Sequence, residues 1–338
     1  MNFVKSVKTF YENSGSDKLF LSVLPAFCAF ICANNTFLFN FYNGILFLTA
    51  VIFLHISIKI FDDFIDWINE NPQKRAELEQ AGIRTLTSKC SHFINKSGSP
   101  RHYFYISLIF FILAILFLGA INIWLSVTVT ILLVVSGLVN YHPKFYTIIS
   151  KTSTELLISI LCAPVNILFM FIACAKCIRL QIIYLSIIIF FLVISVCLIP
   201  SIINIKSDTI TNKTTLPIIL NNKKIMMCLL MLFITVPYIL VAIGVYFNIL
   251  PILSILTLAL SGHSIWLFYL ILLFEKEPQK TIKWNFLMGE DKYKTKNEQK
   301  NISWFTVRCN FARNIFVTFI LLLIISLIDW SGTFIFPY

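Results

Sequence analysis

The chain is a succession of long apolar runs separated by short polar segments. About 18 to 25 apolar residues of helix cross roughly 30 Å of hydrocarbon, so each run is read as a membrane-spanning helix. The nine predicted helices cover residues 18–34, 39–61, 103–120, 123–140, 154–174, 180–203, 224–247, 250–274 and 309–329. The alternation of a membrane β-barrel strand is absent. The pattern predicts an all-α polytopic membrane bundle, in which residues 1–17 form a cytoplasmic segment and residues 18–338 form a single membrane domain.

Composition and charge agree with a membrane protein. The chain is 58% hydrophobic and only 13% charged, which excludes an ordinary soluble domain. Its net charge of +11 comes mainly from loops on one predicted side, and only Lys176 and Arg179 fall on the other. This positive-inside distribution predicts a cytoplasmic N-terminus and excludes nucleic acid as the partner. Most of the nine cysteines lie in apolar runs, which argues against a disulfide framework.

Carboxylates are scarce, yet four of them crowd the end of the second predicted helix. Only 16 of 338 residues are Asp or Glu, and Asp62, Asp63, Asp66 and Glu70 fall within nine positions. At helical spacing three of the four share one face, where like charges repel one another and weaken a helix. A divalent cation with a phosphate-bearing ligand offsets such repulsion at a membrane boundary. We call residues 62–70 motif one.

A second polar pair follows the sixth predicted helix. Asn204 and Asp208 are again four residues apart, and Lys213 and the sequence Thr215-Leu216-Pro217 come next. We call residues 204–208 motif two. Both helices are predicted to end on the cytoplasmic side, so the two motifs are expected to meet at one ligand, in the manner of an internal repeat.

These residue types favour a magnesium diphosphate site. Mg²⁺ prefers oxygen ligands and is usually held by carboxylates together with substrate phosphates. The predicted metal ligands are Asp62, Asp63, Asp66, Glu70, Asn204 and Asp208, of which Asp63, Asp66 and Asp208 are also the predicted catalytic residues. The predicted diphosphate-binding residues are Lys59, Arg75, Arg84, Lys89, Lys206 and Lys213. Two roles stay open for Lys59, a diphosphate contact or a salt bridge to motif one. Two alternative roles stay open for the other basic residues. They either follow the positive-inside rule or contact anionic lipid.

A prenyl diphosphate suits this arrangement, because its lipid tail can lie between helices while its head stays at the boundary. Ionisation would give an allylic cation for an electron-rich acceptor, and an apolar bundle would exclude water. The candidate acceptor-pocket residues are His55, Tyr141, Glu155 and Asn166. Hydrogen bonding between helices is the alternative role for such buried polar residues.

With these motifs, the chain resembles the UbiA superfamily of intramembrane prenyltransferases over essentially its whole length. The family's N-D-x-x-D-x-x-x-D motif matches residues 62–70, and its D-x-x-x-D motif with a following T-L-P matches residues 204–217. Tyr141-His142-Pro143 and Glu155 resemble the family's segment between helices 4 and 5. The resemblance implies a nine-helix bundle, Mg²⁺ as cofactor, and transfer from a polyprenyl diphosphate to a small lipophilic or aromatic acceptor, such as a quinone precursor. It also implies a multi-pass protein of the plasma membrane whose active site faces the cytoplasm.

The motifs depart from the family pattern at several positions. Asp62 stands for Asn, Glu70 for Asp, and Asn204 for the first Asp of motif two. The family's Arg-Pro-Leu segment is matched at best by residues 84–86, and Asn212 and Asn221 stand where glycine is usual. These departures indicate a divergent branch. Three alternatives to prenyl transfer remain: a terpene cyclase of the same fold, a non-catalytic binder of a diphosphate lipid, and a transporter.

Overall fold

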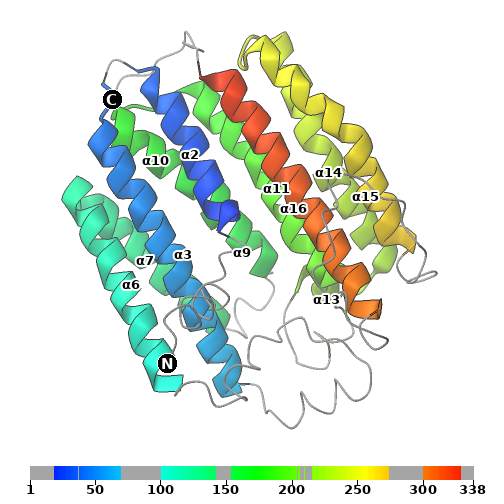
Figure 1. Ribbon diagram of the computed structural model, residues 1–338, viewed down its shortest axis with the longest axis horizontal. Coiled ribbons are helices and arrows are strands. Elements are labelled where there is room, and N and C mark those ends of the chain that lie inside the picture. The colour runs from blue at the N-terminus through cyan, green and yellow to red at the C-terminus, as the bar shows by residue number, and fades with distance from the viewer. Residues whose placement is uncertain are drawn as a thin grey trace. The chain divides into compact units, whose positions relative to one another are not determined.

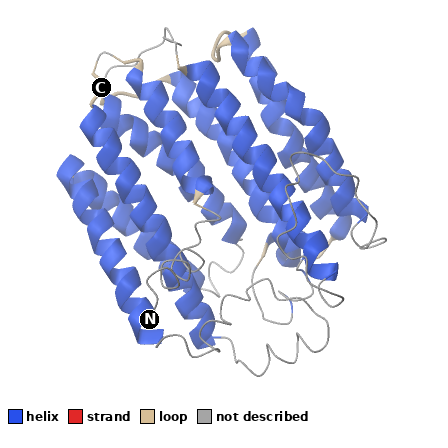
Figure 2. Ribbon diagram, viewed as in Figure 1, coloured by secondary structure: helices blue, strands red, loops and turns tan. Residues whose placement is uncertain are grey.

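The computed structural model divides the chain into two compact units. It describes residues 19–36, 38–69, 100–141, 154–203, 205, 209, 215–273 and 300–328. The first unit comprises residues 1–151 and 169–176, and the second comprises residues 152–168 and 177–338. All regular secondary structure of the described residues is helical, and no strand occurs among them (Figure 2). The predicted all-α class is confirmed.

The first unit is built on a long helix that packs between two others. Its helices are α2 (Phe20–Asn34), α3 (Phe41–Asn69), α6 (Pro100–Ile121), α7 (Ile123–Tyr141) and the end of α10 (Asn166–Ala175). α3 packs along α6 and also against α2, while α7 packs against α6 (Figure 1). Ser57 and Ser107 join α3 to α6, since each hydroxyl donates to the other residue's carbonyl at 2.9 Å. Inside a membrane the hydrophobic effect does not drive helices together, so hydrogen bonds between helices contribute to their association.

The start of α3 is fastened to the end of α10 within the same unit. The backbone N–H of Asn40 donates to the carbonyl of Cys174, and the Asn43 side-chain amide donates to the carbonyl of Ala173, both at 2.9 Å. Gly44 allows α3 to approach both α2 and α10 closely, because a Cβ there would lie 2.2 Å from the ring of Phe30 on α2 and 3.1 Å from the sulfur of Cys174 on α10. These contacts fix the end of α3 that lies away from motif one.

The second unit surrounds one helix that is apolar on all sides. Its elements are α9 (Thr154–Ile160), η3 (Leu161–Val165), the start of α10, α11 (Leu180–Ile203), α13 (Leu216–Leu220), α14 (Lys223–Tyr246), η4 (Ile252–Leu260), α15 (Ser261–Leu273) and α16 (Lys300–Leu327). α11 packs against α9, η3, α14 and α16. A helix without a polar face is expected at such a central position.

Two stretches of the second unit depart from α-helical geometry. η3 is a π-helical turn around Pro164, whose missing N–H removes one bond of the α-helical ladder. η4 is a 3₁₀ helix, in which Ser254, Thr257 and Leu260 are all buried. Their spacing of three residues matches the three residues per turn of this helix type. Ser254 then pairs with Ser326 of α16 at 2.9 Å.

The helices found agree closely with the runs predicted. Among the described residues, seven stretches are long and apolar enough to cross a membrane, namely Phe41–Phe61, Phe104–Ile121, Glu155–Ala175, Leu180–Ile202, Lys223–Tyr246, Ile252–Leu273 and Arg308–Leu327. Two other predicted runs correspond to the shorter apolar stretches Phe20–Asn34 and Ile123–Leu132. The chain is therefore a multi-pass membrane protein. The count of nine spans, the side of the N-terminus and the single membrane domain stay predictions.

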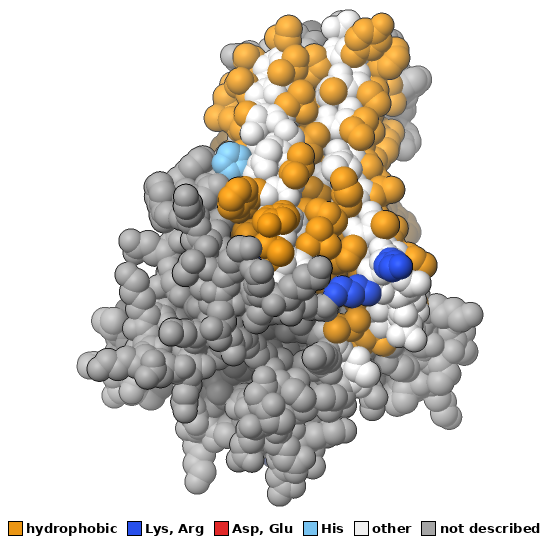
Figure 3. Space-filling model, turned by 90° about the vertical axis from the view of Figure 1, so that its right-hand side faces the viewer, with side chains coloured by type: hydrophobic (Ala, Val, Ile, Leu, Met, Phe, Trp, Pro, Cys, Tyr) orange, Lys and Arg blue, Asp and Glu red, His pale blue; other side chains and the backbone are white. Residues whose placement is uncertain are grey.

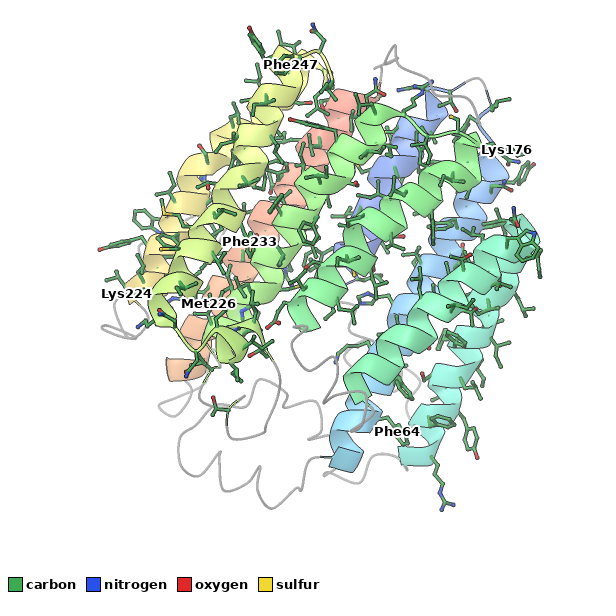
Figure 4. The ribbon with its side chains drawn as sticks, turned by 180° about the vertical axis from the view of Figure 1, so that it is seen from behind. Phe64, Lys176, Lys224, Met226, Phe233 and Phe247 are labelled. Carbon is green, nitrogen blue, oxygen red and sulfur yellow. The ribbon has the colours of Figure 1, made fainter. Side chains whose placement is uncertain are left out.

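The surface of the described helices agrees with this class. Figure 3 shows a face covered by hydrophobic side chains, with Lys and Arg side chains toward one end. On α14, Met231, Ile239 and Ile243 are exposed, as expected for side chains that face lipid. Lys223 and Lys224 are exposed at the start of the same helix. Figure 4 shows Lys224 and Phe247 at opposite ends of α14.

Candidate functional site

Residues 62–69 of motif one lie on the helical backbone of α3. The helix continues through Asn69, so positions 62 and 66 are one turn apart on a regular helix, as their spacing predicts. The structure describes the backbone of Asp62, Asp63 and Asp66, while their side chains and all of Glu70 lie outside the described residues. In the first unit, Phe64 of this segment and Lys176 lie at opposite ends (Figure 4).

One side of α3 is occupied by its packing against α6. The rings of Phe61 and Phe64 lie 6.5 Å and 5.4 Å from the ring of Phe104. Phe53 continues this row and lies 5.6 Å from Phe110, and Ser57 bonds to Ser107. At about 100° per residue, positions 62, 63 and 66 fall on the opposite side of α3 from this row.

Two further polar residues share the side of α3 that carries the acidic positions. His55 and Lys59 precede Asp63 at steps of four residues, and both are partly buried. His55 Nδ1 lies 2.9 Å from the hydroxyl oxygen of Ser22, which places the imidazole against α2. The contact explains how His55 is held between two helices of the first unit. Its place in the pocket for the prenyl acceptor stays a prediction.

Motif two follows the end of α11 in the second unit. Asn204, Lys206, Asp208 and Lys213 lie outside the described residues. Between them, the Thr209 hydroxyl donates to the carbonyl of Ile205 at 2.7 Å. Thr215 has an extended backbone and precedes α13, which carries Pro217 in its first turn. Proline suits this position because it has no N–H to leave unpaired.

Glu155 binds the main chain just after motif two. Its side chain is only 3% exposed, and its Oε2 accepts a hydrogen bond of 3.1 Å from the backbone N–H of Leu216. α13 packs against α9, α11 and α14, so the contact lies inside the second unit. The sequence indicates Glu155 as a candidate site residue. It does not reveal the hydrogen bond to Leu216, which is 61 residues away along the chain.

The π-helical turn separates two predicted acceptor residues. Glu155 and Asn166 would share a face of an uninterrupted α-helix, but the extra residue of η3 rotates later positions by about 100°. Asn166 is buried, and its side-chain amide lies 3.5 Å from the carbonyl of Cys162.

The remaining predicted site residues have no described side chain. Tyr141 is the last residue of α7 and is described by its backbone alone, while Arg75, Arg84 and Lys89 lie outside the described residues. Within the described part of the chain, no group of three or more His, Cys, Asp or Glu could hold a metal ion. The side chains of the predicted metal ligands lie outside the described residues.

Arg308 is a buried charge that directly precedes the last predicted helix, at residues 309–329. It is 1% exposed, and its Nε donates to the carbonyl of Leu270 at 2.9 Å. That carbonyl lies in the last turn of α15, where backbone acceptors lack helical partners and a positive charge is favourable. The position of Arg308 directly before the last predicted apolar run was the available signal, because buried charges in membrane helices usually have a role.

Comparison with known proteins identifies the fold. No protein-family model matches the sequence, and neither does any curated protein. A solved structure of a digeranylgeranylglyceryl phosphate synthase matches with a TM-score of 0.57 and 16% identity, over 96% of this chain and 100% of the other. A UbiA homologue from Aeropyrum pernix K1 matches with a TM-score of 0.54 and 13% identity, over 88% and 95%. The chain has the UbiA fold.

A further structure of this fold contains ligands. It is a UbiA homologue from Archaeoglobus fulgidus bound to GPP and Mg²⁺, with a TM-score of 0.50, 14% identity, and coverage of 93% of this chain and 99% of the other. The UbiA fold thus extends over nearly the whole chain, at identities that establish the architecture alone.

Proposed function

We propose that this protein is a Mg²⁺-dependent prenyltransferase that moves a prenyl group from a polyprenyl diphosphate to a small lipophilic or aromatic acceptor. The observation that carries the proposal is the position of motif one on a regular helix of a UbiA fold. A homologue with that fold is bound to GPP and Mg²⁺, and another structure of it holds DMAPP and Mg²⁺. A quinone precursor is one example of such an acceptor.

The donor set of the two motifs suits magnesium. Asp62 and Asp66 occupy positions one turn apart on helical backbone, on the side of α3 away from α6. The proposed ligands are the carboxylates of Asp62, Asp63, Asp66, Glu70 and Asp208 and the amide oxygen of Asn204. All are the hard oxygen donors that Mg²⁺ takes together with substrate phosphates. When bound, the ion neutralises diphosphate charge and improves it as a leaving group.

The basic residues near the motifs would bind the remaining phosphate oxygens. Lys59 shares the acidic side of α3, and the other proposed contacts are Arg75, Arg84, Lys89, Lys206 and Lys213. The reaction breaks the bond between the allylic carbon and the diphosphate oxygen, and the electron pair leaves with diphosphate. An electron pair of the acceptor then forms the new bond to carbon, and the acceptor loses a proton to restore neutrality.

The apolar helices would protect the allylic cation from water until the acceptor reacts. His55, Tyr141, Glu155 and Asn166 are the proposed acceptor-side residues. We place the protein in the plasma membrane with this site facing the cytoplasm, on the side to which the basic loops are assigned.

Product analysis of the purified protein in lipid nanodiscs tests the proposal. The protein is incubated with a prenyl diphosphate and Mg²⁺, with and without a hydroxybenzoate or naphthoate acceptor. We expect a prenylated acceptor and free diphosphate, formed only when Mg²⁺ and acceptor are both present. A cyclic hydrocarbon formed without acceptor would show a terpene cyclase instead. Binding or flux of the diphosphate lipid without any covalent product would show a binder or a transporter.

A further inference from the structure

The most exposed apolar side chains of the described residues gather at three turns between helices. The five with the largest exposed fractions, between 65% and 80%, are Tyr42, Ile123, Trp124, Tyr246 and Ile252. Tyr42 lies at the turn between α2 and α3, and Trp124 lies at the turn between α6 and α7. The third turn connects α14 to η4. Exposed apolar surface that is gathered in this way marks a place where a protein contacts something other than water.

Each turn lies at one end of a long helix. α3 begins at Phe41, so the α2–α3 turn lies at the end of α3 opposite motif one. The start of α6 meets the end of α3, where the rings of Phe104 and Phe64 lie 5.4 Å apart, so the α6–α7 turn lies toward the start of α3. On α14, Lys224 and Phe247 lie at opposite ends, and the α14–η4 turn is at the end of Phe247 (Figure 4).

The composition of the three turns suits a membrane boundary. Residues 34–43, 119–126 and 244–253 contain no Asp, Glu, Lys or Arg. Each stretch instead combines Asn with Tyr, Trp or Phe. Tyr and Trp have an apolar ring with one polar group, and they are enriched where the hydrocarbon of a bilayer meets the lipid headgroups.

The backbone of the α14–η4 turn is hydrogen-bonded within the protein. The N–H groups of residues 247–250 donate to carbonyls of α14 at 2.7 to 3.0 Å, and Pro251 has no N–H. Asn248 has a φ of 55°, the left-handed conformation with which many helices end. A turn outside regular helix is tolerated at membrane depth when its polar groups are paired in this way.

The α6–α7 turn is paired in a similar way. Asn122 alone separates the two helices. Its N–H donates to the carbonyl of Leu118 at 3.0 Å, and its Oδ1 accepts from the N–H of Trp124 at 2.8 Å. The Ser126 hydroxyl donates to the carbonyl of Ile115 at 3.2 Å. This turn therefore also needs little water.

The aromatic turns lie about one membrane thickness from the polar ends of the same helices. On α3, Tyr42 and Asp62 are 20 residues apart, which corresponds to about 30 Å of helix. On α14, Lys224 and Tyr246 are 22 residues apart, which corresponds to about 33 Å. The hydrocarbon core of a bilayer is about 30 Å thick. In each unit, one end of a helix therefore reaches one boundary of the hydrocarbon when the other end reaches the opposite boundary.

A cation lies near the aromatic end of the first unit. Lys176 is exposed just after α10, whose end is joined to the start of α3 by the bond from the N–H of Asn40 to the carbonyl of Cys174. A lysine at such a place can extend its ammonium to lipid phosphates while its methylene groups stay against apolar surface.

We propose that each of the three aromatic turns binds the boundary between lipid headgroups and acyl chains, in the leaflet opposite motif one for the first unit and opposite Lys224 for the second. The turns thereby set how deeply each unit lies in the bilayer. At the α14–η4 turn this surface continues the lipid-facing side of α14, where Ile239 and Ile243 are exposed. The proposal does not depend on the proposed function.

Hydroxyl-radical footprinting of the purified wild-type protein, one copy in each lipid nanodisc, tests the proposal. We expect Tyr42, Trp124 and Tyr246 to be oxidised at least about fivefold more slowly than in the unfolded peptides, because lipid covers side chains that the protein leaves exposed. No other protein is present, so such protection is due to lipid. Oxidation at the rate of the peptides would overturn the proposal, since it would show that the turns lie in water or need a protein partner to cover them.

Lipids that carry bromine at defined depths then measure where the turn lies. The fluorescence lost in Trp124→Phe is the emission of Trp124. Trp266→Phe gives the matched control, because Trp266 is 45% exposed and lies inside the span Ile252–Leu273.

We expect Trp124 to be quenched about twofold more strongly by bromine near the headgroups than by bromine near the chain ends, and Trp266 to show the reverse order. Strongest quenching of Trp124 at the chain ends, or the same depth profile for both tryptophans, would overturn the proposal.

Discussion

Thr215 carries a buried hydroxyl for which the described residues supply no hydrogen-bond partner. The side chain is 7% exposed, and Oγ1 makes no hydrogen bond to any residue that the structure describes. The carbonyl of the same residue accepts from Ile218 and Ile219, so the start of α13 does not need the hydroxyl. A buried polar group without a partner costs about 1–3 kcal/mol.

We therefore expect Thr215→Val to keep or raise the melting temperature. Valine has nearly the same shape as threonine and removes the unpaired hydroxyl, which recovers part of that cost. Thermal unfolding of both proteins in the same detergent measures the effect, with Thr215→Ser as the control that keeps the hydroxyl and loses the methyl group. A fall of several degrees in the valine variant would show that the hydroxyl has a partner in the folded protein.

At the residue scale, the spacing of residues along the chain predicted local helical structure. It did not predict contacts between residues that are far apart in the sequence. The steps from Asp62 to Asp66 indicated a helix, and α3 is helical there. Glu155 could be selected from its place near an apolar run, but its partner Leu216 is 61 residues away. That contact depends on how α9 and α13 pack, which no local pattern contains.

Gly44 shows how closely the elements of the first unit approach one another. A Cβ at this position would lie 2.2 Å from the Phe30 ring on α2 and 3.1 Å from the Cys174 sulfur on α10. Gly262 of α15 is the opposite case, because a Cβ there meets no atom within 4 Å.

The two glycines predict opposite effects of the same substitution. Gly44→Ala is expected to destabilise the protein by about 1–3 kcal/mol, because the extra carbon overpacks the contact with Phe30. Gly262→Ala is expected to be neutral or to stabilise by about 0.5–1 kcal/mol, because alanine favours a helix interior. Chemical denaturation in mixed micelles can compare them. Equal stability of the two variants would contradict the close packing of α2, α3 and α10.

At the element scale, the apolar runs predicted where helices occur but not their type. Length and hydropathy locate spans such as α11 because crossing hydrocarbon requires them. The sequence prediction treated residues 154–174 and 250–274 as uniform helices, whereas the structure contains a π-helical turn at η3 and a 3₁₀ helix at η4. Pro164 gave a local signal for the first. The second depends on the burial of Ser254 and Thr257 against neighbouring helices, which is tertiary information.

At the scale of the whole molecule, two short acidic motifs predicted the architecture better than overall sequence similarity does. The structures that share the UbiA fold are only 13–16% identical to this chain, yet they match most or all of its length. The motifs stood out because a membrane helix rarely carries several carboxylates without a ligand. Their resemblance to the motifs of the UbiA superfamily then led to the predicted fold. The meeting of the two motifs stays a prediction, since it concerns side chains outside the described residues.

Magnesium-dependent turnover of Asp66→Asn, Asp208→Asn and the double variant tests whether both motifs serve one substrate. We expect each single variant to lose at least about a hundredfold in turnover, because each removes a carboxylate that is proposed to hold the Mg²⁺ that neutralises the diphosphate charge. The double variant should lose little more than either single one, as residues that act as a unit are not additive. Wild-type turnover in both single variants would contradict the account.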